Sequence, residues 1–285
     1  MKYFLLALLL LPAPLLAQVA TTTIPPTAPA RDTTATSEWT LSLLADQRSF
    51  YLGREYGNKA FSLAPSLSYS HSSGLYGTVS GYYFQQSQSP RYAFTDLELG
   101  YTNGVTKAWM YSVSYNRVFF TPPTSATDKL IPNGLEAYTA YKLGPLKAAA
   151  DYNFFFGKSS AQTITLALSG ELKKEDWLGL DAVRLTPEAQ MLWGSPLALA
   201  RYCGTYTTTS TTGVLGRRQV LRAAEAEAQI VRLLGYELAL PLEVDHGALA
   251  YTLTGHYIVP RRTIDDPATP LPTRAYLSLQ VDFSF

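Results

Sequence analysis

The chain has 285 residues, a net charge of +1 at pH 7 and 16% charged residues, against about 25% in an ordinary soluble domain. This balance gives no electrostatic basis for binding nucleic acid or an acidic partner. The mean hydropathy of −0.01 is too polar for a bundle of membrane-spanning helices, whereas 13% aromatic residues suit strands that have one apolar and one polar face.

The first 37 residues are expected to precede the folded part of the chain. Lys2 and the apolar run from Phe4 to Leu11 are typical of a secretory signal peptide, which we predict over residues 1–17. A membrane-spanning helix would need about 20 apolar residues, far more than this run supplies. Residues 18–37 are rich in Thr, Ala and Pro and predict a flexible lead-in. The single cysteine, Cys203, cannot form an internal disulfide.

From Glu38 onward, apolar and polar residues alternate with a period of two. Such a period predicts β-strands, because successive side chains of a strand point to opposite faces. We predict twelve strands, at 38–46, 61–71, 75–86, 92–102, 106–120, 135–143, 146–156, 162–173, 182–195, 227–244, 248–259 and 274–285. The segment 216–235 also contains strong helix formers, so part of it is either a helix in a long loop or, as we favour, an extension of the strand.

Short and long connections alternate between these strands. Short turns are predicted at 72–74, 103–104, 144–145 and 245–247, and long polar loops at 47–60, 121–134, 196–226 and 260–273. Asn103-Gly104 predicts a two-residue hairpin turn with positive φ at both positions. Only 174–181 is long for its place among the short turns.

The last segment, Arg274 to Phe285, has one apolar face and ends in an aromatic residue. This strand resembles the terminal strand of bacterial outer-membrane β-barrel proteins, and the resemblance in pattern covers residues 38–285. It implies an all-β fold, a transmembrane antiparallel up-and-down β-barrel of about twelve strands. It also implies contact with outer-membrane lipid and insertion by the barrel-assembly machinery. In a Gram-negative outer membrane the short turns are periplasmic, so an even strand count predicts that both termini are periplasmic.

Two arginines fall on the apolar face of this pattern and count against it. Arg117 lies near the end of a predicted strand, where its guanidinium can extend to the lipid headgroups. Arg232 marks either a β-bulge or the helix in the ambiguous segment.

The inward face predicts a polar lumen with charges of both signs. The candidate lumen-lining residues are Asp96, Glu98, Glu136, Asp151, Arg184, Glu188, Glu237, His256, Arg274 and Asp282. Twelve strands are intermediate between about eight, which side chains nearly fill, and about 16 to 18, which leave an aqueous pore. We predict a passive channel for small polar solutes. A structural or surface-binding barrel, whose paired side chains fill the lumen, stays open as an alternative.

An outer-membrane lipid hydrolase is the least favoured alternative. Some twelve-stranded barrels are phospholipases with His and Ser two residues apart, and His71 and Ser73 resemble that spacing. The resemblance is incomplete, because this chain has Gly74 where that family has Asn. The pair is also predicted in a turn, which does not fix a nucleophile and its base. We therefore expect no catalytic site. The sequence has no metal cluster or nucleotide motif, so no metal and no cofactor are expected.

Overall fold

The computed structural model describes residues 37–51, 54–56, 61–86, 89–120, 131–195, 198, 230–261 and 273–285. The predicted signal peptide, most of the lead-in and residues 216–229 of the ambiguous segment lie outside these ranges. Within them, no helix has the length and apolar character that crossing a membrane requires.

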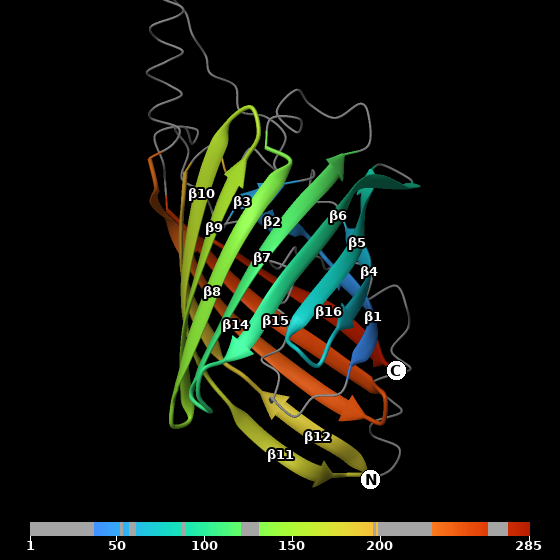
Figure 1. The fold of residues 1–285 in the computed structure, drawn as a ribbon. Coiled ribbons are helices and arrows are strands. Elements are labelled where there is room, and N and C mark those ends of the chain that lie inside the picture. The colour runs from blue at the N-terminus through green and yellow to red at the C-terminus, as the bar shows by residue number, and fades with distance from the viewer. Residues whose placement is uncertain are drawn as a thin grey trace, which may run out of the picture.

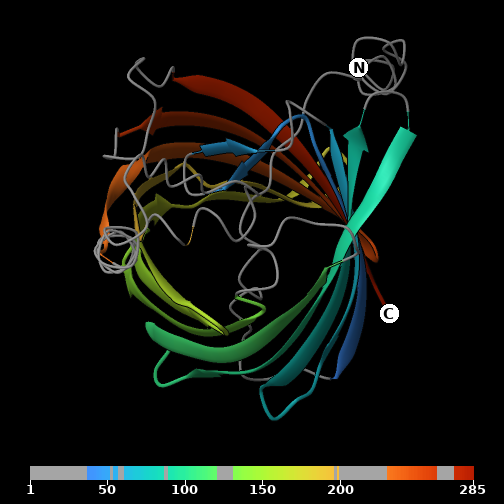
Figure 2. The ribbon, with the colours of Figure 1, turned by 90° about the horizontal axis from the view of Figure 1, so that it is seen from above.

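Twelve strands close into one antiparallel barrel (Figures 1 and 2). They are β1 (Glu38–Asp46), β4 (Ser62–Ser70), β5 (Leu75–Gln86), β6 (Ser89–Gly104), β7 (Trp109–Phe120), β8 (Asn133–Leu143), β9 (Leu146–Phe156), β10 (Ser160–Gly170), β13 (Glu188–Gly194), β14 (Arg232–His246), β15 (Leu249–Pro260) and β16 (Arg274–Ser284). Because β1 pairs with both β4 and β16, this ring has no free edge. A closed sheet gives every backbone N–H and C=O a partner, as hydrocarbon surroundings demand. The predicted twelve-stranded up-and-down barrel is confirmed.

The alternation of the sequence separates two faces of this barrel. Large apolar side chains lie exposed on the outer face; among them are Leu41, Leu67, Leu99, Val113, Leu135, Leu166, Leu238, Leu253 and Leu279. Small polar side chains on the inner face are buried, for example Ser80, Ser112 and Thr165. An outer surface so rich in apolar side chains is unfavourable in water but matches lipid. The barrel therefore has the surface of a membrane-spanning protein.

Both ends of the described chain lie at the end of the barrel that carries the short turns (Figure 1). The Trp39 N–H donates to the Phe285 carbonyl at 3.0 Å, and the Phe285 N–H donates to the Trp39 carbonyl at 2.9 Å. At the same end the rings of Trp39 and Tyr69 lie 4.7 Å apart. Aromatic rings at strand ends are typical of the interfacial girdles of membrane barrels.

The predicted turn at Asn103-Gly104 is wrong. Both residues still pair with β7, Asn103 opposite Tyr111 and Gly104 opposite Met110. The chain reverses only afterwards, where the Thr106 hydroxyl accepts the N–H groups of Ala108 and Trp109. These hydrogen bonds stabilise the reversal, and none of residues 103–109 has a positive φ.

The segment 174–181 is part of a β-hairpin rather than a loop. It belongs to β11 (Leu172–Trp177) and β12 (Leu180–Leu185), which extend beyond the ends of the neighbouring strands (Figure 1). The predicted strand 182–195 is correspondingly divided at Pro187 into β12 and β13, both of which pair with β14. A proline interrupts the ladder because it has no N–H to donate. A second small hairpin, β2 (Ser49–Tyr51) with β3 (Arg54–Tyr56), lies at the opposite end.

Arg232 does not point to lipid, because β14 contains a bulge. The register between β13 and β14 shifts so that Leu192 pairs with Gly235 but Trp193 pairs with Leu233, which leaves Leu234 as an extra residue. Arg232 then lies opposite Gly194, on the inner face. Arg117 does face outward, with its guanidinium carbon 5.3 Å from the centre of the Phe119 ring.

Replacing Gly235 by Ala at this bulge is expected to destabilise the barrel by about 1–3 kcal/mol. A Cβ atom there would lie 2.8 Å from the backbone carbonyl oxygen of Val259, which cannot move without disturbing the ladder. Gly255→Ala is the matched control, because its nearest neighbour is the Leu277 side chain at 3.6 Å. Urea unfolding in lipid vesicles, followed by tryptophan fluorescence, measures both. Equal stabilities of the two variants would contradict the proposed crowding.

Candidate functional site

The structure places the predicted lining residues on the inner, less exposed face of their strands. They come from seven strands of the ring and from the β11–β12 hairpin: Asp96 and Glu98 (β6), Glu136 (β8), Asp151 (β9), Arg184 (β12), Glu188 (β13), Glu237 (β14), His256 (β15), and Arg274 and Asp282 (β16). They are not gathered at one point. Three groups of contacts can be distinguished: an acidic group, a group around His256, and a group at the end of the barrel with the short turns.

The acidic group, which we call the acidic patch, consists of Asp96, Glu98, Glu136 and Asp151. β7 lies between β6 and β8 and contributes Ser112 and Ser114, and β9 pairs with the other side of β8. Hydrogen bonds hold two of the carboxylates in place. The Tyr76 hydroxyl donates to Glu98 at 2.8 Å, and the Asn153 amide donates to Asp151 at 2.8 Å.

The second group surrounds His256 on β15. Its Nδ1 atom lies 2.7 Å from Glu237 Oε1, and its Nε2 atom lies 3.2 Å from Ser278 Oγ. The Tyr276 hydroxyl donates to the same Glu237 oxygen at 2.9 Å, and its ring stacks on the imidazole at 4.4 Å. The register brings these side chains together, since His256 lies opposite Tyr276 and Ala239.

A serine, an imidazole and a carboxylate in this order can activate a nucleophile where substrate reaches the hydroxyl. Ser278 and His256 are each only 5% exposed. The His256 group therefore acts as a polar cross-link between β14, β15 and β16. Sequence reasoning proposed Glu237 and His256 as separate lining residues and missed both Tyr276 and Ser278 as their partners. Alternation gives the face of a residue, but only the register gives its neighbours.

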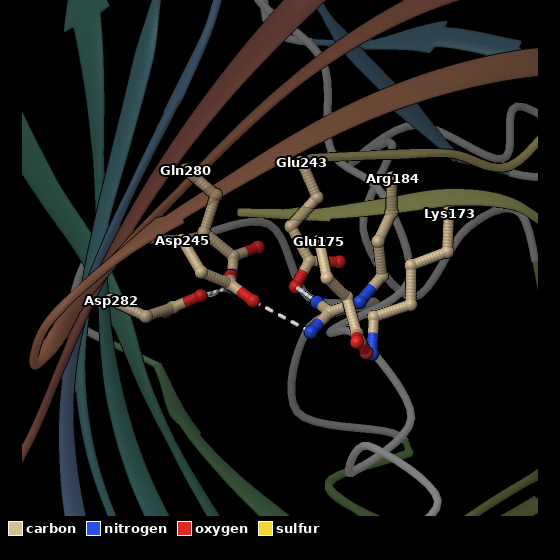
Figure 3. Close-up of polar contacts among 7 residues, drawn as sticks. All are labelled: Lys173, Glu175, Arg184, Glu243, Asp245, Gln280 and Asp282. Carbon is tan, nitrogen blue, oxygen red and sulfur yellow. Dashed lines mark hydrogen bonds and ion pairs between the residues drawn. The ribbon is translucent and has the colours of Figure 1, made fainter. Parts of the chain in front are cut away.

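The third group, which we call the mouth cluster, lies where the β11–β12 hairpin leaves the barrel (Figure 3). It consists of Lys173, Glu175, Arg184, Glu243, Asp245, Gln280 and Asp282. The Arg184 guanidinium donates to Glu243 and, at 2.6 Å, to Asp245. On the hairpin, Lys173 donates to Glu175 at 2.6 Å, and this bond lowers the pKa of the exposed Glu175 carboxyl. Gln280 on β16 donates to both oxygens of Asp282 at 2.9 Å (Figure 3).

Arg184→Met is expected to destabilise the barrel by about 2 kcal/mol, since it removes two charge-assisted hydrogen bonds. It also leaves Glu243 and Asp245, which both bind Arg184 in the structure, without this cation. Lys173→Met is the control, because exposed ion pairs such as Lys173–Glu175 contribute about 0–1 kcal/mol. Urea unfolding of both variants measures the difference. A smaller loss of unfolding free energy for Arg184→Met than for Lys173→Met would contradict the stabilising role of Arg184.

Apolar side chains occupy the inner face near the end with the long connections. One cluster comprises Leu44, Ala64, Tyr82, Phe94 and Val118, and the other comprises Ile131, Phe155, Ala161, Ala198 and Leu234. The polar groups described above lie nearer the middle and the opposite end of their strands. Near the end with the long connections, the inner face therefore carries apolar clusters beside its polar side chains.

The two residues of the hydrolase alternative do touch. Nδ1 of His71 lies 2.9 Å from Ser73 Oγ, in the exposed turn between β4 and β5. A nucleophilic serine needs a base that is itself held in place. Among the described residues, no carboxylate forms a hydrogen bond with the His71 ring, which lies 6.4 Å from the Tyr69 ring. The pair therefore gives no support to a catalytic site. Among the described residues, no group of three or more His, Cys, Asp or Glu side chains could hold a metal ion.

Comparisons with known proteins return outer-membrane barrels at low similarity. The chain is similar to the KdgM porin, with 8% identity, a TM-score of 0.49, and coverage of 86% of this chain and 99% of that one. It is similar to LpxR from Salmonella typhimurium, with 12% identity, a TM-score of 0.39, and coverage of 87% and 99%. For the outer membrane protein OprD from Pseudomonas aeruginosa the values are 11%, 0.37, and 88% and 65%. No family model and no curated protein matches the chain. These likenesses are too distant to indicate a function for this chain.

Proposed function

We propose that this outer-membrane β-barrel is a passive channel for small polar solutes. The observation that carries the proposal is the inner face, where all twelve strands of the ring contribute at least one polar side chain. Polar groups such as Ser68 and Thr78, which lie 2.9 Å apart, can replace water around a passing solute. An interior needed only for packing would be filled most favourably by apolar side chains.

The charged groups of the inner face differ along the axis. The acidic patch and Glu237 lie in the interior of their strands, whereas Glu188 is the first residue of β13. Basic residues lie nearer the strand ends: Lys142 and Lys147 at the short turns, and Arg232 and Arg274 at the long connections. We infer that a solute meets a polar, mainly acidic middle section. The short-turn end is proposed to face the periplasm, with both termini there, as in other barrels of this class.

A structural barrel is the second candidate, and one observation favours it. The two apolar clusters are buried on the inner face, where an open pore would expose them to water. They narrow the lumen at the end with the long connections. The two candidates differ in one respect, which is whether the lumen conducts.

Single-channel recording in planar bilayers separates them. The purified, folded barrel in symmetric 1 M KCl is expected to produce uniform conductance steps, because its polar lining passes hydrated ions. The same protein unfolded by heat before addition is the control. An absence of steps from protein shown to be inserted and folded would contradict the channel and support the structural barrel.

A further inference from the structure

We infer that the acidic patch is a binding site for an organic cation of the ammonium or guanidinium class, which occupies it during passage through the lumen. The inference rests on the proposed channel function and adds the class of solute to it. Three features of the patch support it: like charges held close together, a buried acceptor atom without a partner among the described residues, and a geometry that does not suit a metal ion.

The carboxylates of the patch repel one another. The charged groups that act most strongly on Glu136 are Asp151, Glu98 and Asp96, all of them acidic. The register explains this proximity, because Glu136 lies opposite Ser114 on β7 and Asn153 on β9, one inner-face position from Asp151. Like charges in a partly dry lumen raise the free energy of the barrel, and a bound cation lowers it.

One buried acceptor in the patch, Asp151 Oδ1, has no hydrogen-bond partner among the described residues. Asp151 is only 8% exposed. Buried polar atoms in native proteins are nearly always hydrogen-bonded, to protein, water or ligand. The other oxygen of Asp151 already accepts the Asn153 amide, so Asp151 is held in position. Its Oδ1 atom can accept a further N–H.

The arrangement favours a polyatomic cation over a metal ion. In the described part of the chain, the acidic side chains are not grouped closely enough for three of them to reach one metal ion. Ammonium and guanidinium groups donate several hydrogen bonds and accept none. They therefore match carboxylate and hydroxyl oxygens that come from several strands. The acidic surface also extends beyond the patch, because Glu188 and Glu136 both act on Tyr138.

Reversal potentials and block by arginine test this inference. In planar bilayers under a tenfold KCl gradient, the wild-type barrel is expected to prefer K⁺ over Cl⁻. Added L-arginine hydrochloride at millimolar concentration is expected to reduce the K⁺ current, whereas sodium L-glutamate at the same concentration is not. In Glu136→Gln/Asp151→Asn, which keeps side-chain shape, the arginine concentration for half block is expected to rise at least about tenfold, since two ionic contacts are lost.

Glu175→Gln/Asp176→Asn is the control, because it makes the same change in charge on the exposed strand β11, outside the ring. This variant should retain the arginine block. Conductance steps without cation preference in the wild type would overturn the inference and leave the channel intact. Equal arginine block in wild type and in Glu136→Gln/Asp151→Asn would also overturn the inference and leave the channel function intact. An absence of any conductance would instead contradict the proposed function. The wild-type measurement stands even if the double variant does not fold.

Discussion

Removing residues 274–285 is expected to prevent the barrel from folding. These residues form β16, which pairs with β15 from Leu249 to Ile258 and with β1 from Thr40 to Asp46. Without β16, two strands would present unpaired N–H and C=O groups to hydrocarbon, each at a cost of several kcal/mol. Gel mobility of unheated samples, after refolding into detergent or lipid, distinguishes the compact barrel from the unfolded chain. The truncated chain should show no compact band.

Phe285→Ala is the matched control for this truncation. Phe285 is 64% exposed, and its ladder contacts with Trp39 are made by its backbone. The variant should refold in vitro, because every backbone hydrogen bond is kept. In cells its insertion should slow, if the terminal aromatic residue is the signal that the resemblance implies. A folded, compact band from the chain truncated before Arg274 would contradict the closure of the ring by β16.

Leu279→Arg is expected to destabilise the barrel by about 2–4 kcal/mol, the cost of an arginine near the bilayer midplane. Leu279 lies in the middle of β16, faces outward and is 44% exposed. Its cross-strand neighbours are Ala45 and Leu253, which offer the guanidinium no polar partner. Urea unfolding in lipid vesicles measures the loss.

Gln280→Arg tests the other face at the next position. Gln280 points inward and donates to Asp282, so an arginine there has a carboxylate within reach. The stability of this variant should change by less than about 1 kcal/mol, since lumen positions tolerate polar substitution. Equal losses at positions 279 and 280 would show that the two faces of β16 do not meet different surroundings.

The period-two alternation was sufficient to predict the barrel. Strands such as 38–46 and 75–86 match β1 and β5 closely, because one face must contact lipid and the other the lumen. The hairpin of β11 and β12 was not predicted, because the alternation on which the prediction depends is absent from β11. Its residues Lys173 to Asp176 have no apolar face, since this part of the sheet leaves the membrane, and all of β11 is exposed.

The faces of individual residues were predicted wherever the period was uninterrupted. The bulge at Leu234 adds one residue and moves Arg232 from the outer face to the inner one. A bulge has no unique signature in a single sequence, because it is fixed by the partner strand. The turn predicted at Asn103-Gly104 was wrong for a similar reason. Both residues still belong to the β6–β7 ladder, in which Gly104 pairs with Met110.

The contacts of the candidate site could be predicted only in part. Alternation assigned each of the ten proposed residues to the inner face, but it does not predict which of them contact one another. His256 with Glu237, and Arg184 with Glu243, depend on the stagger between adjacent strands. That stagger follows from closure of the whole ring. The acidic patch is likewise a product of the register across β6 to β9.

The central claim is that solutes pass through the lumen of this barrel, and cysteine modification during recording tests it most directly. In a Cys203→Ser background, Thr252→Cys places a thiol on the inner face and Leu253→Cys places one on the outer face of the same strand. A bulky water-soluble methanethiosulfonate is expected to reduce the current stepwise for Thr252→Cys and to leave Leu253→Cys unchanged. Unaltered current through Thr252→Cys, with modification shown to be complete by mass spectrometry, would contradict passage through the lumen.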